Sequence, residues 1–193
     1  MIDTNSLDMI FRNARTYSTW TDKTITVELL KKVYDLAKMG ATSANCSPMR
    51  VVFVQSAAAK EKLKPCLVEG NVEKTMTAPV TTLIAADDEF YNKLPTLFPH
   101  ADAKSWFVGN DELIKTTAFR NSTLQGAYLM LAARACGLDC GPMSGFNNQL
   151  LDDTFFKGTT YKSNFICNLG YGDEKGLFPR GPRPDFDEVC KII

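Results

Sequence analysis

The chain has 193 residues, of which 45% are hydrophobic and 23% charged, as in a globular domain with a substantial core. Its 22 basic residues balance its 22 acidic ones without a long basic run, which argues against nucleic-acid and membrane-surface partners. Neither a membrane-spanning stretch nor a signal-peptide core is visible, so we expect one domain over residues 1–193 in a soluble, cytoplasmic protein.

The first third of the chain alternates predicted helices with a short strand. A helix is expected over Leu7–Arg15. Thr26 is a typical N-cap for a second helix over Val27–Met39, where apolar residues recur at helical spacing. A small, polar, turn-rich loop at 40–50 then leads into a β-branched run, Val51–Gln55, which predicts a buried strand.

Helical and extended patterns continue toward the C-terminus. Ala57–Val68 has the pattern of a helix, and Glu69–Thr77 that of a loop or the start of a helix. Ala78–Ala86 is the clearest strand, and Asn164–Gly170 predicts a third. The remaining residues are rich in proline and glycine, so no regular helix is expected before Asp185.

The connection from Asp87 to Asp111 is long and rich in aromatic residues. Two interpretations fit it equally: a lid or pocket wall, or short helices that dock their aromatic side chains on the core. It also holds His100, the single histidine of the chain. A lone loop histidine is more often exposed than used as an acid.

The stretch from Phe119 to Phe146 organises the chain. Its first half has apolar and small residues at helical spacing with few charges, which predicts a helix buried centrally or in a subunit interface. Gly137 is expected to end this helix in the left-handed conformation. The run CGPMSGF at 140–146 is predicted to be irregular, either an ordinary turn or a loop whose glycines pass close to a flat ligand.

The six cysteines favour buried, reduced thiols over disulfides, since the chain reads as unsecreted. No CxxC motif occurs and there is a single histidine, so no metal site is expected.

Five short motifs, in order, resemble those of the FMN-dependent nitroreductase family. Their counterparts here are Arg15-Thr16, Thr42 to Pro48, Asn71 with Lys74, Gly137-Leu138 with Pro142 to Gly145, and Gly170-Tyr171 with Arg183. Each motif is weak alone, but their ordered occurrence along almost the whole chain is specific. The runs TSANCSP, LFPHADAKSWF, TAFRNS and GLDCGPMSGF are similar to the malonic semialdehyde reductase branch of that family, which serves pyrimidine degradation.

This resemblance implies an α+β fold of the nitroreductase type. It has a mixed, mostly antiparallel sheet flanked by helices, in an intertwined homodimer with two FMN sites at the interface. Small residues in the predicted central helix would let two copies approach closely. These residues are Gly126, Ala127, Ala132 and Ala133.

The resemblance also implies a flavin site with distinct roles. Arg15, Thr16 and Arg183 are expected at the phosphate, with Arg180 second. Lys74 with Asn71 would face the pyrimidine end of the ring, and the backbone N–H groups of Ser144 and Gly145 its reactive edge. The predicted catalytic residues are Lys74, Ser144 and Gly145. The predicted cofactor-binding residues are Arg15, Thr16, Thr42, Ser43, Asn45, Asn71, Lys74, Pro142, Met143, Ser144, Gly145, Arg180 and Arg183.

The implied activity is ping-pong hydride transfer from NADH or NADPH through FMN, because a flavin carries the hydride while the protein supplies position and electrostatics. The acceptor would be malonic semialdehyde, reduced to 3-hydroxypropionate, with Arg50 or Arg120 as an anchor for its carboxylate. A general NAD(P)H:quinone or nitro-compound reductase is the alternative. A non-catalytic flavin-binding module is a second one, because Ala14 and Ser18 stand where the family often has basic residues.

Overall fold

The computed structural model describes all residues from Met1 to Ile193. Its centre is an antiparallel sheet of four strands in the order β1-β2-β4-β3. The strands are β1 (Met49–Val54), β2 (Val80–Asp87), β3 (Asp139–Met143) and β4 (Tyr161–Gly170). Every residue of β2 is buried, as expected for a strand in the middle of a sheet that is covered on both faces. The one parallel element is a bridge between Thr16 and Cys140.

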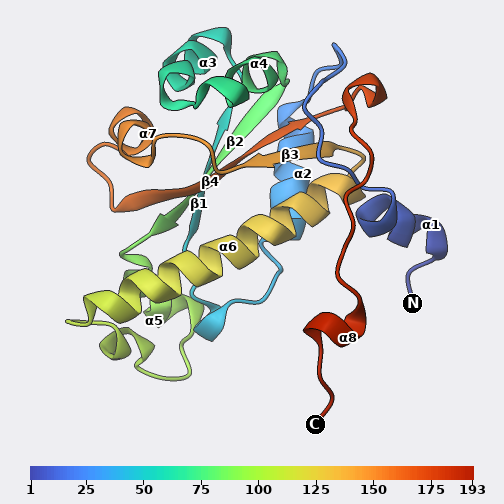
Figure 1. Cartoon of the computed structure of the whole chain (residues 1–193). Coiled ribbons are helices and arrows are strands. Elements are labelled where there is room, and N and C mark those ends of the chain that lie inside the picture. The colour runs from blue at the N-terminus through green and yellow to red at the C-terminus, as the bar shows by residue number, and fades with distance from the viewer.

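Eight α-helices surround this sheet (Figure 1). They are α1 (Thr4–Leu7), α2 (Val27–Ala37), α3 (Ala57–Leu63), α4 (Glu69–Thr77), α5 (Leu94–Leu97), α6 (Asp111–Ala135), α7 (Asn148–Phe155) and α8 (Phe186–Val189). A π-helical turn, Asp8–Arg12, continues α1, and a 3-10 turn, Ser43–Asn45, precedes β1. None of the helices is long and apolar enough to span a bilayer.

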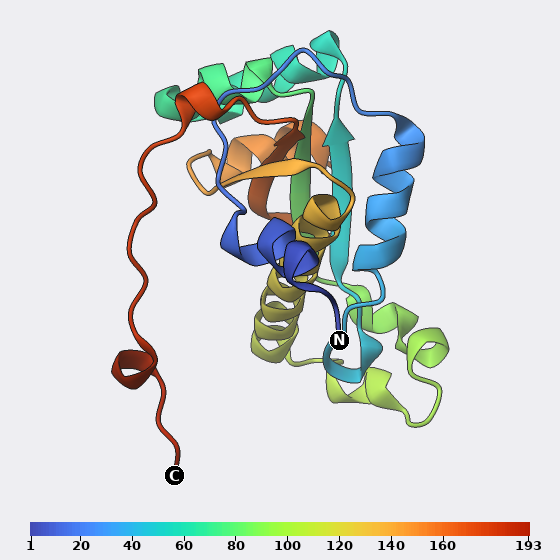
Figure 2. The same cartoon turned by 90° about the vertical axis from the view of Figure 1, so that its right-hand side faces the viewer.

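The two faces of the sheet are buried against different helices (Figure 2). Successive side chains of a strand point to opposite faces. In β2, Val80 and Ile84 therefore join a cluster with residues of α2 and α6, whereas Leu83 and Ala85 join one with residues of α3 and α7. The result is a three-layer arrangement in which α6 crosses one face along its whole width.

The predicted α+β fold with a mostly antiparallel sheet is confirmed, and three of the four strands lie within a few residues of their predicted ranges. Glu69–Thr77 is a complete helix. The run at 140–146 was wrongly predicted to be irregular throughout, because β3 covers its first part and pairs with β4. A Gly-Pro sequence is tolerated there because β3 is an edge strand. Helix α7 was not predicted.

Helix boundaries differ at the N-terminus and agree at the central helix. The first helix begins at Thr4 and its π-turn ends at Arg12, so the prediction of a helix reaching Arg15 was wrong. Asp3 explains the early start, because its side chain accepts a hydrogen bond from the Ser6 N–H as an N-cap does. Gly137 follows α6 with φ of 80°, the left-handed end that the sequence predicts.

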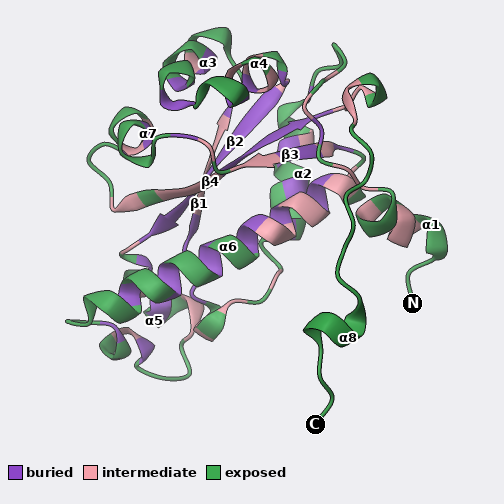
Figure 3. Ribbon diagram, in the orientation of Figure 1, coloured by how far each residue is buried: buried purple, intermediate pink, exposed green.

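Small residues of α6 serve the core of one chain rather than the approach of two copies. A Cβ added to Gly126 would lie 2.5 Å from the ring of Phe165 on β4. Ala132 and Ala133 are buried in the core beside α2. The predicted role of these three residues in a helix–helix contact between subunits was therefore wrong. Figure 3 shows α6 buried along one side and exposed along the other.

All six cysteines are free thiols. Four of them are buried as predicted, and Cys136 is half-buried. Cys190 is exposed in the C-terminal tail, so the prediction of burial was wrong for this residue.

Candidate functional site

A cavity lined by cationic side chains lies where the two ends of the chain meet the C-terminal end of α6. We call it the arginine cavity. Its volume is about 600 Å³. The lining residues are Phe11, Ala14, Arg15, Thr16, Ser18, Lys74, Arg134, Phe178, Arg180, Gly181 and Arg183. Five of these side chains are cationic and none is a carboxylate, although the chain as a whole carries no net charge. Uncompensated positive charge on this scale favours an anionic ligand.

Hydrogen bonds from the arginines to backbone carbonyls assemble the cavity. Arg15 donates to the carbonyl of Phe178, and Arg180 donates to that of Ala14 at 2.9 Å. These two bonds run in opposite directions between the N-terminal segment and the C-terminal tail, so they hold the two segments side by side. Arg183 donates to carbonyls within its own turn. Because no carboxylate neutralises them, the remaining N–H donors can serve a ligand.

Arg134 enters the cavity from the last turn of α6. One of its terminal nitrogens donates to the carbonyl of Ile10 at 3.3 Å, while its buried Nε has no hydrogen-bond partner. A buried polar atom without a partner is uncommon and costs stability. The arrangement fits an anion such as a phosphate, because guanidinium groups pair with phosphate oxygens through two parallel hydrogen bonds.

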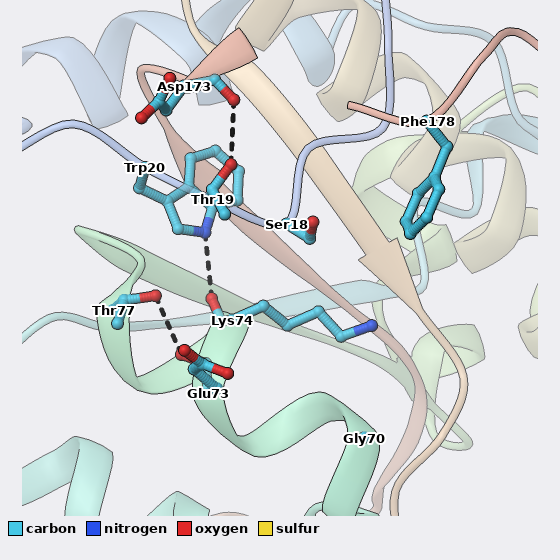
Figure 4. Close-up of a pocket in the computed structure, with 9 residues that line it drawn as sticks. All are labelled: Ser18, Thr19, Trp20, Gly70, Glu73, Lys74, Thr77, Asp173 and Phe178. Atoms are coloured by element: carbon cyan, nitrogen blue, oxygen red, sulfur yellow. Dashed lines mark hydrogen bonds between the residues drawn. The ribbon is translucent and has the colours of Figure 1, made fainter. Parts of the chain in front are cut away.

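Lys74 connects the arginine cavity with a second cavity of about 530 Å³ (Figure 4). It lies in the last turn of α4, and Ser18 and Phe178 also line both cavities. Its amine makes no hydrogen bond or ion pair, and Figure 4 shows the side chain extended with the amine directed away from Glu73. A half-buried, unpaired ammonium here can face a polar ligand that runs from one cavity into the other.

Asn71 and Gly145 are joined at the other end of α4. The Asn71 side chain donates to the Gly145 carbonyl at 2.8 Å, and the Val68 N–H donates to the same carbonyl at 3.2 Å. A Cβ at position 145 would lie 2.6 Å from Asn71 Nδ2, so the close approach requires glycine. The N–H groups of Ser144 and Gly145 donate no hydrogen bond within the protein, which leaves both free for a ligand.

Pro142, Met143 and Ser144 line a different cavity beside α6, where this helix meets β3 and β4; we call it the outer cavity. Its volume is about 440 Å³, and its other walls come from α6 and β4. Those walls are Phe119, Thr123, Met130, Asn164 and Phe165. Phe119 is 61% exposed, so this cavity adjoins an uncovered apolar part of α6.

The 3-10 turn Ser43–Asn45, preceded by Thr42, lies beside α5 and the N-terminal half of α6, whereas the arginine cavity lies at the C-terminal end of α6 (Figure 1). The Asn45 side chain donates to the carbonyl of Leu97 at 2.8 Å, and the Ser43 N–H donates to the Asn121 side chain at 2.8 Å. One chain therefore does not bring these three residues to the arginine cavity. It does bring together Arg15, Thr16, Lys74, Arg180 and Arg183.

The aromatic connection between β2 and α6 fits each of the two interpretations in part: some aromatic side chains dock on the core, and others stay at the surface. Phe90 and Phe107 are buried in a core cluster, with their ring centroids 4.9 Å apart in an edge-to-face contact. Trp106 is 50% exposed and packs edge-on against Phe98. Short helices thus dock two aromatics on the core, while Trp106 stays at the surface. His100 is exposed, as the sequence predicts.

The two arginines considered as substrate anchors differ in availability. Arg50 pairs with the buried carboxylate of Asp87 at 2.6 Å and also donates to two backbone carbonyls, so its guanidinium is occupied. Arg120 is exposed on α6 and makes no hydrogen bond or ion pair. It adjoins Phe119, which lines the outer cavity.

Sequence reasoning missed Arg134 and Trp20. Arg134 is the single charged residue between Arg120 and Asp139, and a lone charge in such an apolar stretch is a signal that could have identified it. Trp20 lies in an irregular segment, and its indole N–H donates to the carbonyl of Lys74 at 3.0 Å. No local pattern in the sequence indicates that contact.

A family model described as "Nitroreductase family" matches residues 12–171, most of the chain. The chain belongs to the nitroreductase family. A relative from Burkholderia lata, named "Putative NADH dehydrogenase/NAD(P)H nitroreductase", is 60% identical over 188 residues, which is 97% of this chain and 96% of that protein. A relative of the same name from Polynucleobacter asymbioticus is 58% identical over 193 residues, covering 100% of this chain and 98% of that protein.

Solved nitroreductase structures share the fold. One, described as a "putative nitroreductase in complex with FMN" from Exiguobacterium sibiricum, superposes with a TM-score of 0.86 at 19% identity and covers 100% of this chain and 99% of that one. A nitroreductase-fold protein from Bacillus subtilis gives the same TM-score and identity over 99% of this chain and all of that one.

Proposed function

We propose that this protein is an FMN-dependent NAD(P)H oxidoreductase whose residues 1–193 form one flavin-binding domain. The arginine cavity carries the proposal, because it gathers four arginines and Lys74 without a carboxylate. The FMN described for the Exiguobacterium sibiricum structure and the NAD(P)H named for the Burkholderia lata relative support the choice of cofactor and electron donor.

The arginines would hold the phosphate of FMN. Arg15, Arg134 and Arg183 approach from the N-terminal segment, the end of α6 and the tail, so their donors can surround one phosphate. Arg180 and Thr16 line the same cavity. In this role Arg134 would contribute positive charge to a phosphate site in which Ala14 and Ser18 supply none.

Lys74 and Asn71 would lie along the pyrimidine end of the flavin ring. When bound, FMN takes a hydride from NAD(P)H and passes it to the acceptor. The Lys74 ammonium would stabilise negative charge that develops at the pyrimidine end, as a preorganised charge does in an active site. The free N–H groups of Ser144 and Gly145 would hold the reactive edge of the ring at a fixed distance from Lys74, through the Asn71 side chain.

Two copies are expected to complete the site. The outer side of α6 exposes Phe119 and Leu124, at 61% and 43%, next to the cavity formed by Pro142, Met143 and Ser144. An exposed apolar surface of this kind marks an interface. In a homodimer through this surface, Thr42, Ser43 and Asn45 of one copy would reach the flavin held by the other. Light scattering tests this, and a flavin-loaded monomer near 21 kDa contradicts it.

Malonic semialdehyde is the acceptor that we propose, from the sequence runs shared with that branch of the family. Its aldehyde carbon would take the hydride and its oxygen a proton, giving 3-hydroxypropionate. Arg120 is the available anchor for its carboxylate, because Arg50 is paired with Asp87. Reduction of nitro compounds or quinones is the second candidate, favoured by the name of the Burkholderia lata relative.

Anaerobic stopped-flow spectroscopy tests the proposal in two steps. The FMN-loaded protein is first mixed with NADH or NADPH, and loss of the yellow colour is expected. A protein that stays oxidised with both donors is a flavin-binding module rather than an enzyme. The reduced protein is then mixed with malonic semialdehyde, a quinone or a nitroaromatic compound. Fast reoxidation by the quinone or nitro compound, with none by the semialdehyde, selects the second candidate.

A further inference from the structure

Lys60 is a buried lysine that the proposed function does not use. It lies on α3 with 4% of its surface exposed. Its amine donates to the carbonyl of Thr75 at 2.5 Å, to the carbonyl of Ala78 at 2.9 Å and to the Thr81 hydroxyl at 2.8 Å. Three acceptors match the three N–H groups of an ammonium, so the charged form is fully hydrogen-bonded.

Two of the three acceptors, the carbonyls of Thr75 and Ala78, lie at the C-terminal end of α4, and the third, Thr81, lies on β2. The last carbonyls of a helix have no partner within the helix, and a cation placed there satisfies them and interacts favourably with the helix dipole. The carbonyl of Lys74, in the same turn, accepts from the Trp20 indole and from the Asn168 amide, both at 3.0 Å. Asn168 is also bonded to Thr81, a partner of Lys60, at 2.7 Å.

A continuous buried network therefore fixes the backbone that carries Lys74. Lys60, Thr81 and Asn168 are all buried, and they come from α3, β2 and β4. At the opposite end, Asn71 anchors α4 to Gly145. Helix α4 thus holds the Lys74 side chain and the Gly145 peptide at a fixed separation. Both are the groups that the proposed function places against the flavin ring.

Burial of a charge at this position is costly for the fold. Desolvation lowers the pKa of Lys60 to about 8. Replacing Lys60 by an apolar residue would remove this desolvation cost, but it would leave the carbonyls of Thr75 and Ala78 without their hydrogen-bond donor. The orientation of the carbonyls at the end of α4 therefore depends directly on the ammonium.

We infer that Lys60 is a positioning residue, which sets the orientation of Lys74 toward the bound flavin through the carbonyls at the end of α4; this rests on the proposed function. Lys60 lines none of the cavities described above, so it acts without touching the flavin. The effect of its removal should pass through Lys74.

A double-mutant cycle between Lys60→Met and Lys74→Met tests the inference. Two properties are measured: the dissociation constant of FMN, from quenching of its fluorescence, and the reduction potential of the bound flavin. Lys60→Met should weaken FMN binding by about tenfold, within the range for residues coupled through one hydrogen-bond network. It should also shift the potential in the same direction as Lys74→Met. In the double variant, Lys60→Met should add nothing further.

Two further variants separate positioning from simple loss of stability. Val33→Ala removes buried volume from α2 on the other face of the sheet, and it should lower stability while leaving both flavin properties unchanged. Lys60→Gln keeps two donors without the charge and should give intermediate values. If Lys60→Met does not fold, Lys60→Gln alone decides the result.

Each outcome has one meaning. Lys60 variants that bind FMN as Val33→Ala does, or that add their full effect to Lys74→Met, overturn the inference and leave the proposed function intact. Wild-type protein that binds no FMN overturns the proposed function and the inference with it. Faster hydrogen exchange at the end of α4 in flavin-free Lys60→Met supports the anchor independently of any flavin.

Discussion

The arginine cavity and the loop at 42–48, near opposite ends of α6, are built in contrasting ways. The cavity gathers cations from distant parts of one chain and leaves them unpaired. The loop has no exposed cation, but Ala44, Asn45 and Ser47 adopt positive φ angles of 49°, 50° and 40°. Such conformations cost on the order of 1–3 kcal/mol each and persist only where surrounding contacts impose them.

Those contacts come from buried amides of α6. Asn121 accepts from the Ser43 N–H, and Gln125 accepts from the Met49 N–H at 2.9 Å. The cavity is thus a charge site that one chain assembles, whereas the loop is a strained element held by buried amides of α6, away from that cavity. This contrast fits the homodimer that we propose, in which the loop of one copy would reach the flavin held by the other.

The largest effect is expected at Phe107, beside the loop. Phe107→Ala empties a buried position against Phe90, and losses of about 3–5 kcal/mol are typical of such truncations. Urea unfolding measures the loss. The neighbouring Trp106→Ala is the matched control, because its side chain is half exposed. It should keep stability and FMN binding and change the ratio of kcat/KM among acceptors. Equal destabilisation by both would contradict this division.

Stability should depend on pH through Lys60. Its pKa falls from 10.5 to about 8 on folding because of burial. Below pH 8 both states bind the proton and stability does not change. Between pH 8 and 10.5 the unfolded state binds more protons, so the free energy of unfolding rises, by up to about 3 kcal/mol. Lys60→Met lacks this rise. Urea unfolding of wild type and Lys60→Met at pH 7.5 and 9.5 measures this rise. The prediction is refuted if the two proteins differ in free energy of unfolding by the same amount at both pH values.

Lys74→Met should slow the hydride step while the flavin remains bound. Removal of a preorganised donor costs about 2–4 kcal/mol in comparable sites. Anaerobic single-turnover reduction of the flavin measures the rate. Lys31→Met, an exposed lysine on α2, is the control and should leave the rate unchanged. A normal rate in Lys74→Met would show that Lys74 has no role in the hydride step.

Arg183→Ala should weaken FMN binding more than His100→Ala does. An arginine contact with a phosphate contributes about 1.5–3 kcal/mol as a charged hydrogen bond. His100 lies in the connection before α6, outside the arginine cavity. Fluorescence titration compares the two variants, and equal affinities would argue against a phosphate beside Arg183.

The smallest effect is expected at Asn121. Asn121→Ala removes the acceptor of the Ser43 N–H, so the loop loses about 1 kcal/mol of hydrogen-bond stabilisation. Hydrogen exchange at Ser43 should become faster, whereas Thr123→Ala, on the exposed side of α6, should not change it. Unchanged exchange in Asn121→Ala would show that other contacts hold the strained loop.

Local sequence patterns predicted the elements that are strongly periodic. β2 is rich in β-branched and apolar residues, and α2 repeats its apolar residues at helical spacing behind the Thr26 cap. β3 was missed because glycine and proline weaken the strand pattern, and its pairing with β4 depends on residues distant in sequence. Tertiary pairing therefore decided the structure where propensity did not.

The sequence motifs predicted several of the residues that line the arginine cavity. Arg15, Lys74, Arg180 and Arg183 line one cavity although they come from three distant segments of the sequence. Arg134 was missed because a helical pattern predicts which face of a helix a residue occupies. It does not predict which distant segments pack against the end of that helix. The network around Lys60 was also out of reach, since its members come from α3, α4, β2 and β4, which only the fold brings together.

The phosphate specificity of flavin binding tests the central claim most directly. The flavin-free protein is titrated with FMN and with riboflavin, which shares the ring and ribityl chain but lacks the phosphate. If the arginine cavity holds the phosphate, FMN should bind at least tenfold more tightly, because a single charged hydrogen bond contributes about 1.5–3 kcal/mol. The preference should decrease as salt concentration rises. Equal affinity for the two flavins would contradict the account.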